Sequence, residues 1–233
     1  MRITSEGDTW VMAGTRTRAT LRASDLALAV EHAGATWSMV PSKAGDLVVR
    51  ASGRDVSLRL ADASEVDVRP YRTGFRTGVK VTLGGWSAPG GAAPGLRLFL
   101  TLGLEGGDED LVFDVAAEET GATVRRLDWP AALDARAVAY TVLPNVRGAL
   151  LPRDWPQAYD PIRPPRPADA AHADHSEIQS HVIESWSMSW WGFKKGAAAM
   201  MVIVETPDDA AYQFEHPAGG PTVVGPRWRA TLG

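Results

Sequence analysis

Apolar and polar residues alternate along much of this chain, and the segment LRLFLTLGL shows the pattern most clearly. Successive side chains of a strand point to opposite faces, so a period of two places every second residue on one side of a sheet. The leucines that share that side are Leu96, Leu98, Leu100, Leu102 and Leu104. The same alternation recurs at residues 26–30, 56–60 and 79–83. It predicts antiparallel strands with one face against a core.

Weaker alternation predicts further strands, and clusters of Gly, Asp and Pro separate the strands into hairpins. The stretches HAGAT, LEGGDED and GFRTGVK are typical of turns between paired strands, and the Gly/Pro-rich stretch 87–95 predicts a flexible hairpin tip. The further predicted strands are residues 111–115, 123–127, 138–143, 183–191 and 198–204.

The fold class expected from this pattern is all-β. No segment keeps a 3.6-residue apolar period over a dozen residues, so long helices are not expected. A dozen or more strands without intervening helices cannot form a parallel, doubly wound sheet. We therefore expect a large two-sheet antiparallel β-sandwich, formed by a single domain over residues 1–233.

One segment interrupts the strand pattern. Residues 152–181 contain six prolines, which remove backbone donors from a strand, and the segment far exceeds the usual connection of roughly 4 to 6 residues. A loop of this length inside a domain is either functional or disordered. We expect a long Pro-rich loop here.

Composition narrows the classes of partner. The chain has 233 residues, 45% of them hydrophobic, and a net charge of −4, which argues against nucleic acid and anionic membranes as partners. It has no cysteine, so disulfides, thiolate metal sites and a cysteine nucleophile are excluded. No apolar run has the length of a signal peptide or membrane span. As written, the expected location is cytoplasmic, with a secreted parent protein left open.

The segment ESWSMSWWGF, residues 184–193, concentrates three tryptophans. In a strand, Trp186, Met188 and Trp190 would share one face and Trp191 would lie on the other, and we expect Trp186 and Met188 to pack in the core. Because adjacent residues cannot enter the same core, either Trp190 or Trp191 should lie near solvent or under a loop. An exposed indole can bind the apolar face of a sugar ring, so both residues are candidate carbohydrate contacts.

Other candidate residues lie in or near the long loop. Trp155 and His175 are predicted carbohydrate contacts, as is Asp208 in VETPDDA, although this stretch also has the composition of a turn. The sequence HADHSE contains metal-ligand residue types, but its Pro/Ala-rich setting favours a solvated loop, so no metal and no cofactor are expected. Motifs for a serine nucleophile, a dinucleotide and a phosphate-binding loop are lacking, and no catalytic residue is predicted.

Three stretches resemble a known family. YTVLPNVRGALLPRDW, SWSMSWWGFKKGAAAMMVIVETPDDAAYQF and PRWRATLG are similar to the amino-terminal β-sandwich module of glycoside hydrolases related to the endo-α-N-acetylgalactosaminidases. The first 135 residues match only in strand rhythm. The resemblance implies a galactose-mutarotase-like supersandwich that precedes a TIM-barrel catalytic domain carrying the catalytic carboxylates. None of the five histidines lies in the His-x-Tyr-Phe-Asn-Leu context of true aldose mutarotases, which argues against epimerase activity.

Three hypotheses follow for the function. The preferred one is a non-catalytic module that contacts carbohydrate, packs against a C-terminal catalytic domain of the same polypeptide and completes its substrate cleft. The second is a stand-alone epimerase, lyase or hydrolase that uses His175 or His181 with Glu205 or Asp208. The third is a purely structural domain whose aromatic residues serve only packing.

Overall fold

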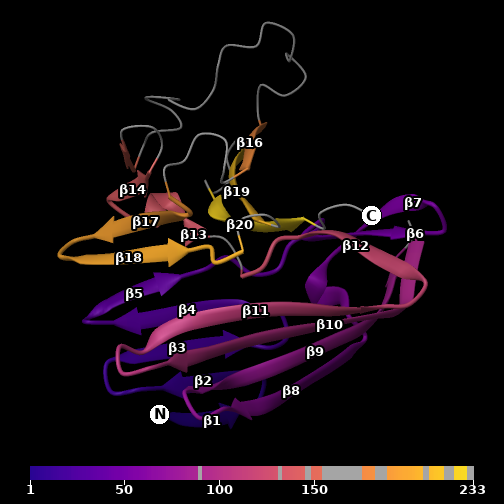
Figure 1. Cartoon of the computed structure of the whole chain (residues 1–233), viewed down its shortest axis with the longest axis horizontal. Coiled ribbons are helices and arrows are strands. Elements are labelled where there is room, and N and C mark those ends of the chain that lie inside the picture. The colour runs from indigo at the N-terminus through magenta and orange to yellow at the C-terminus, as the bar shows by residue number, and fades with distance from the viewer. Residues whose placement is uncertain are drawn as a thin grey trace, which may run out of the picture. The chain divides into compact units, whose positions relative to one another are not determined.

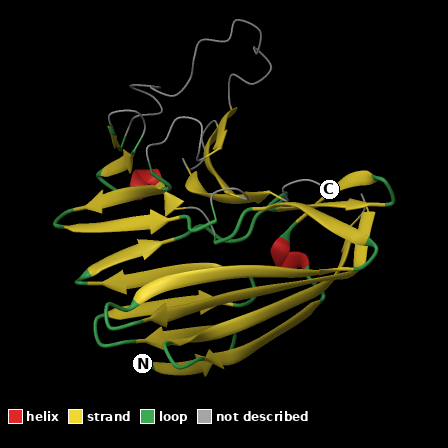
Figure 2. Ribbon diagram, in the orientation of Figure 1, coloured by secondary structure: helices red, strands yellow, loops and turns green. Residues whose placement is uncertain are grey.

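The described part of the computed structural model is built from antiparallel strands. It covers residues 1–88, 91–130, 133–144, 148–153, 175–181, 188–206, 210–217 and 223–229. Within these residues the only helices are two single turns of 3-10 helix, drawn in red in Figure 2. The all-β prediction is confirmed. The chain divides into two compact units, Met1–Ala131 and Ala132–Gly233, here called unit 1 and unit 2.

Unit 1 begins with a five-stranded meander in which each strand pairs with the next along the chain. Its inner face is continuous, since Leu21 lies opposite Leu28, and Val30 lies opposite Trp37. All four of these side chains are buried. The strands are β1 (Arg2–Glu6), β2 (Thr9–Ala13), β3 (Thr17–Arg22), β4 (Ala27–His32) and β5 (Ala35–Ser38).

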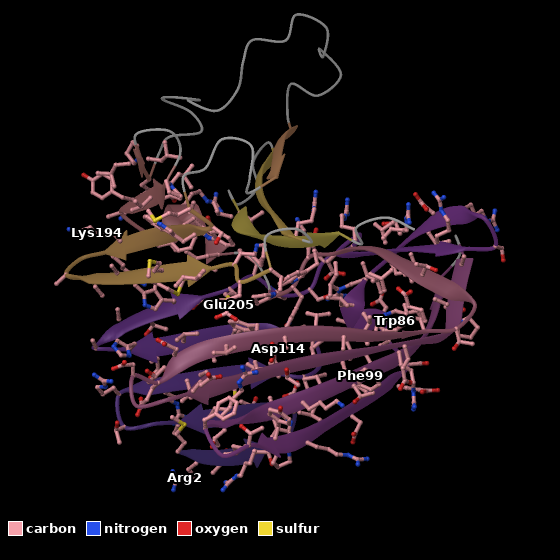
Figure 3. The ribbon with its side chains drawn as sticks, in the orientation of Figure 1. Arg2, Trp86, Phe99, Asp114, Lys194 and Glu205 are labelled. Carbon is pink, nitrogen blue, oxygen red and sulfur yellow. The ribbon has the colours of Figure 1, made fainter. Side chains whose placement is uncertain are left out.

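The leucine ladder lies in a second sheet of unit 1, with strand order β11-β10-β9-β8. All five leucines are 0% exposed, and they face residues such as Val79, Val81 and Leu83 on the neighbouring strand, which confirms the predicted buried face. Phe99 and Asp114, labelled in Figure 3, occupy the other face. The strands are β8 (Glu65–Arg72), β9 (Arg76–Ala88), β10 (Gly91–Glu105) and β11 (Asp110–Glu119).

These two sheets of unit 1 are adjacent, because β9 contacts both β1 and β2 (Figure 1). A further set of strands in unit 1 is hydrogen-bonded in the order β12-β6-β7, and the 3-10 turn η1 (Leu60–Asp62) follows β7. Unit 1 alone therefore has more than two sets of paired strands, and the expectation of a two-sheet sandwich is wrong. Alternation indicates which residues form strands, but strand pairing depends on distant segments. The strands of this set are β6 (Leu47–Ala51), β7 (Arg54–Leu58) and β12 (Ala122–Leu127).

Unit 2 contains a four-stranded sheet with the order β15-β14-β17-β18. A second set of strands pairs in the order β16-β19-β20, with β13 also paired to β20. The strands are β13 (Leu133–Asp134), β14 (Tyr140–Leu143), β15 (Ala149–Pro152), β16 (His175–His181), β17 (Trp190–Lys195), β18 (Ala198–Ile203), β19 (Ala210–Pro217) and β20 (Val223–Arg229), and the 3-10 turn is η2 (Ala135–Ala137).

Three boundaries differ from the sequence-based predictions. Of the Pro-rich loop expected at 152–181, residues 175–181 form β16, Pro152 ends β15 and Arg153 follows it in a turn. Residues 154–174 lie outside the described residues. The strand expected at 183–191 begins at Trp190 within the described chain and continues to Lys195. The hairpin tip expected at 87–95 is shorter, because β9 reaches Ala88 and β10 starts at Gly91. Within the described residues, no helix has the length and apolar character needed to cross a membrane.

Candidate functional site

The adjacent tryptophans of β17 lie on opposite faces of their sheet, as the sequence predicted. Trp191 is 1% exposed, whereas Trp190 is half-buried. The prediction that only one of the pair enters the core is therefore confirmed. Trp190 is the residue left accessible to a ligand.

The prediction of which face is buried is wrong. Met188, expected in the core with Trp186, is 56% exposed, and the buried large side chains of β17 are Trp191 and Phe193. The reason is local, because Met188 and Ser189 form a bend before β17 begins, so the strand alternation does not extend back through them. Trp186 lies outside the described residues.

The inner face of this four-stranded sheet is densely apolar but contains two polar atoms. Its buried side chains are Thr141, Leu143, Leu151, Trp191 and Phe193. Within the described chain, the Nε1 of Trp191 and the Oγ1 of Thr141 are buried without a hydrogen-bond partner. A buried donor without a partner costs about 1 to 3 kcal/mol relative to a paired one. Trp191 thus acts in packing, and in this arrangement its ring is not open to a sugar.

On the outer face, the ring of Trp190 lies close to the strand beside Gly192. A Cβ atom added to Gly192 would lie 3.7 Å from Cζ3 of Trp190 and 3.0 Å from the carbonyl oxygen of Met200. The tight contact is with the carbonyl oxygen, whereas the distance to the indole is an ordinary van der Waals contact, so the ring lies against the strand at Gly192. An indole supported on one side by the strand can offer its other side to an apolar ligand surface.

The remaining predicted contacts are not brought together by the described structure. Trp155 and Asp208 lie outside the described residues. His175 is the first residue of β16 and is paired in register with Pro217 of β19. His181, the last residue of β16, is paired with Ala211 of the same strand. Glu205, labelled in Figure 3, is exposed after β18. The predicted His/carboxylate pair remains a prediction.

Metal binding finds no support in the part of the chain that the structure describes. It contains no group of three or more His, Asp or Glu side chains that could hold an ion. The ligand types in HADHSE lie partly outside the described residues, and the side chains of β16 are not described.

Sequence reasoning missed a carboxylate cradle in unit 1. The buried Glu109 carboxylate accepts hydrogen bonds from the backbone N–H groups of Thr15 at 2.5 Å, Arg16 at 2.9 Å and Thr17 at 2.7 Å, and from the Thr15 hydroxyl at 2.6 Å. The Thr15 hydroxyl, followed by the backbone donors of Thr15 and Arg16, lowers the pKa of Glu109 to about 2. The cradle is filled by the chain's own carboxylate, so it connects two hairpins and offers no ligand site.

A shallow polar depression of about 280 Å³ lies beside this cradle. Arg18 and Glu31 of its lining are cross-strand neighbours, and His32 shares a 2.8 Å hydrogen bond with Thr17 through Nδ1. The polar side chains of the depression thus pair with one another or with neighbouring residues, as on an ordinary solvated surface. Trp190 therefore remains the better candidate for a ligand contact.

A second buried carboxylate, Asp46, organises the turn after β7. It accepts hydrogen bonds from the Ser42 hydroxyl at 2.6 Å, the backbone N–H of Leu60 at 2.7 Å and the backbone N–H of Lys43 at 3.0 Å. Burial outweighs these hydrogen bonds and raises the pKa of Asp46 to about 6, and the nearby Asp128 acts in the same direction. Sequence patterns did not indicate Asp46, because two of its three donors are backbone N–H groups that no motif marks.

The described strands define an all-β, antiparallel protein. Solved structures of the alpha-N-acetylgalactosaminidase NagBb from Bifidobacterium bifidum share this fold. A quadruple mutant of NagBb matches with a TM-score of 0.69 and 22% identity over 96% of this chain and 33% of that chain. The GalNAc complex and the ligand-free form match with TM-scores of 0.66 and 0.67, each at 22% identity over 100% of this chain and 34% of that chain.

These matches concern a part of a larger enzyme. The chain spans about a third of the length of the NagBb structures. At 22% identity the similarity shows the fold alone. No family model and no curated protein sequence matches the chain.

Proposed function

We propose that this chain is a non-catalytic, carbohydrate-associated module of a glycoside hydrolase. The observation that carries the proposal is the fold match, which extends over nearly all of this chain but only a third of a glycoside hydrolase. The sequence resemblance to amino-terminal modules of related hydrolases supports the same assignment. The module would pack against a catalytic domain and contribute to its substrate cleft.

Within this proposal, Trp190 is the carbohydrate contact. Its half-buried indole rests beside Gly192 and can cover the C–H face of a pyranose ring. Trp155, His175 and Asp208 are further contacts that rest on the sequence alone. Trp191 enters the proposal only as the packing residue that fixes the position of Trp190.

The test is calorimetric titration of the full chain with GalNAc and with GalNAc-containing oligosaccharides, using glucose as the control sugar. GalNAc is chosen because a matched NagBb structure is described as its complex. We expect saturable binding that Trp190→Ala weakens roughly tenfold, since stacking on an aromatic ring contributes on the order of 1 kcal/mol. Trp10→Ala removes another half-buried tryptophan, in unit 1, and should leave binding unchanged.

If Trp10→Ala weakens GalNAc binding as much as Trp190→Ala does, or if no sugar binds, carbohydrate contact is contradicted and the purely structural role is favoured. The stand-alone enzyme is distinguished by turnover. If the chain alone releases GalNAc from an aryl glycoside, and His175→Ala or His181→Ala abolishes that release, the chain is an enzyme and the non-catalytic proposal is wrong.

A further inference from the structure

The outer face of the sheet β15-β14-β17-β18 carries a continuous set of apolar side chains. One row across the sheet runs from Leu150 through Val142 and Gly192 to Met201, because these residues are directly opposite one another in register. In the next row Trp190 lies opposite Ile203, and on the other side Tyr140 lies opposite Lys194. We call this surface the apolar face; its residues are Tyr140, Val142, Leu150, Trp190, Met201 and Ile203.

The apolar face is strongly exposed for its composition. Leu150, Met201 and Ile203 are 58%, 60% and 59% exposed, and Tyr140 is also exposed. Among the described strand residues on this side of the sheet, the charged residue is Lys194, which lies in the row of Tyr140 (Figure 3). Four strands about 4.8 Å apart and three rows of side chains cover roughly 300 Å². This area is comparable to the largest apolar patch on a typical monomer, which is often functional.

Apart from Trp190 in its end row, the apolar face has a chemistry that suits a protein partner better than a sugar. Three of its most exposed residues are aliphatic or methionine, and methionine adapts its shape to an apposed surface. Sugars are bound through polar groups placed around an aromatic platform, and such groups are lacking among the described residues of this face, apart from the Tyr140 hydroxyl and Lys194 at one end. Depletion of charge at the centre is typical of protein interface cores.

We propose that the apolar face docks the catalytic domain of the glycoside hydrolase to which this module belongs. The proposal rests on the proposed function, and the partner is chosen because the matched NagBb structures have about twice as much additional chain as the shared part. Leu150 on β15 and Met201 and Ile203 on β18 lie on the two edge strands and supply the most exposed apolar area of the interface. Trp190 lies on the inner strand β17, in the end row opposite Ile203, where it contacts both the partner and the substrate cleft.

The experiment mixes the full chain with the remainder of the polypeptide encoded by the same reading frame, each produced separately, and measures the complex by light scattering and calorimetry. We expect a 1:1 complex that Met201→Lys/Ile203→Lys weakens at least about tenfold, because two charges would be buried in an apolar contact. The matched control is Val66→Lys/Phe75→Lys, which adds the same charges at exposed apolar residues of unit 1 and should leave binding intact. Circular dichroism checks folding, and the milder Leu150→Gln provides a second variant of the apolar face.

Three results would overturn the proposal. They are a reading frame that encodes no further domain, the absence of a complex, and binding by the Met201→Lys/Ile203→Lys variant that equals binding by the wild type. A homodimer of the chain alone that the same variant dissolves would assign the face to a second copy instead. Peroxide oxidation provides an independent measurement: exposed Met201 should react fast in the free chain and slowly in the complex, with buried Met12 as the internal slow reference. Protection of Met201 in the free chain would mean that the chain covers its own face, which also contradicts docking.

The two proposals fail in different ways. Loss of GalNAc binding in the titration, with an intact complex, removes the carbohydrate contact but keeps the docking surface. Sugar binding by the chain without a complex removes the docking surface but keeps the carbohydrate-associated module.

Discussion

At the scale of single residues, the two adjacent tryptophans have separate tasks. Trp191 is enclosed with Thr141 and Phe193, whereas Trp190 lies at the surface beside Gly192. The sequence alone predicted that the pair would divide in this way, because neighbouring strand residues face opposite sides. It did not identify which residue is buried, and the expected core position of Met188 was wrong.

Replacement of each tryptophan by alanine should therefore have different effects on stability. Trp191→Ala leaves a large cavity and should lower the free energy of unfolding by about 3 to 5 kcal/mol. Trp190→Ala removes less contact and should cost less than about 1.5 kcal/mol. Urea denaturation followed by far-ultraviolet circular dichroism measures both, and equal losses would contradict the assigned burial. Trp191→Phe, which also removes the Nε1 donor, should cost less than Trp191→Ala.

Asp46 should make stability depend on pH with a definite sign. Its pKa is about 6 in the folded chain, above the value near 3.9 of an unfolded aspartate, so the folded state binds more protons between these values. The stabilising contribution is fully present below about pH 4 and is lost as the pH rises through about 6. Relative to Asp46→Asn, which cannot titrate, the wild type should lose on the order of 2 kcal/mol between pH 4 and pH 7.

Chemical denaturation at several pH values measures this difference for Asp46. The control is Asp67→Asn, an exposed carboxylate whose replacement should leave the wild-type pH profile unchanged. The free energy of unfolding of the wild type minus that of Asp46→Asn should fall as the pH rises. If this difference is constant or rises with pH, the buried carboxylate is not the cause of the pH dependence.

At the scale of elements, Glu109 joins the β10–β11 hairpin to the turn between β2 and β3. The residues it connects are more than 90 positions apart in the sequence, and Glu109 adopts a positive φ of 61° to reach them. Gly14 is required nearby, since a Cβ atom there would lie 2.4 Å from the Glu109 carboxylate. The hairpins themselves were predicted from turn composition, but this connection was not, because no local pattern marks a carboxylate whose donors are mostly backbone groups more than 90 positions away.

Glu109→Gln should lower the midpoint of thermal unfolding. An amide has one acceptor oxygen, and its NH₂ group would face two backbone donors where the carboxylate accepts from both. Because the folded pKa of Glu109 is lowered to about 2, the stabilisation is present above the unfolded value and is lost as the pH falls towards 2. Scanning calorimetry of Glu109→Gln against Glu118→Gln, an exposed carboxylate on β11, measures the effect at pH 7 and pH 3. Matching midpoints for the two variants at pH 7 would refute the structural role of the cradle.

At the scale of the whole molecule, the chain combines an antiparallel all-β fold with a match to one third of a larger hydrolase. Each unit buries its apolar strand faces, as Leu100 does in unit 1 and Phe193 does in unit 2. Unit 2 also leaves the apolar face exposed at Leu150, Met201 and Ile203. A stable isolated protein gains nothing from such exposure, and this is the physical reason for assigning the face to a partner.

The sequence by itself determined the strand period, the buried side of the leucine ladder, the turn positions and the division of the tryptophan pair. These features follow from the local geometry of an extended chain, in which alternate side chains share a face. Only the tertiary structure decided the strand pairing, the burial of Trp191 instead of Trp190, and the partners of Asp46 and Glu109. Those depend on contacts between segments far apart in the chain, which no local pattern of apolar and polar residues encodes.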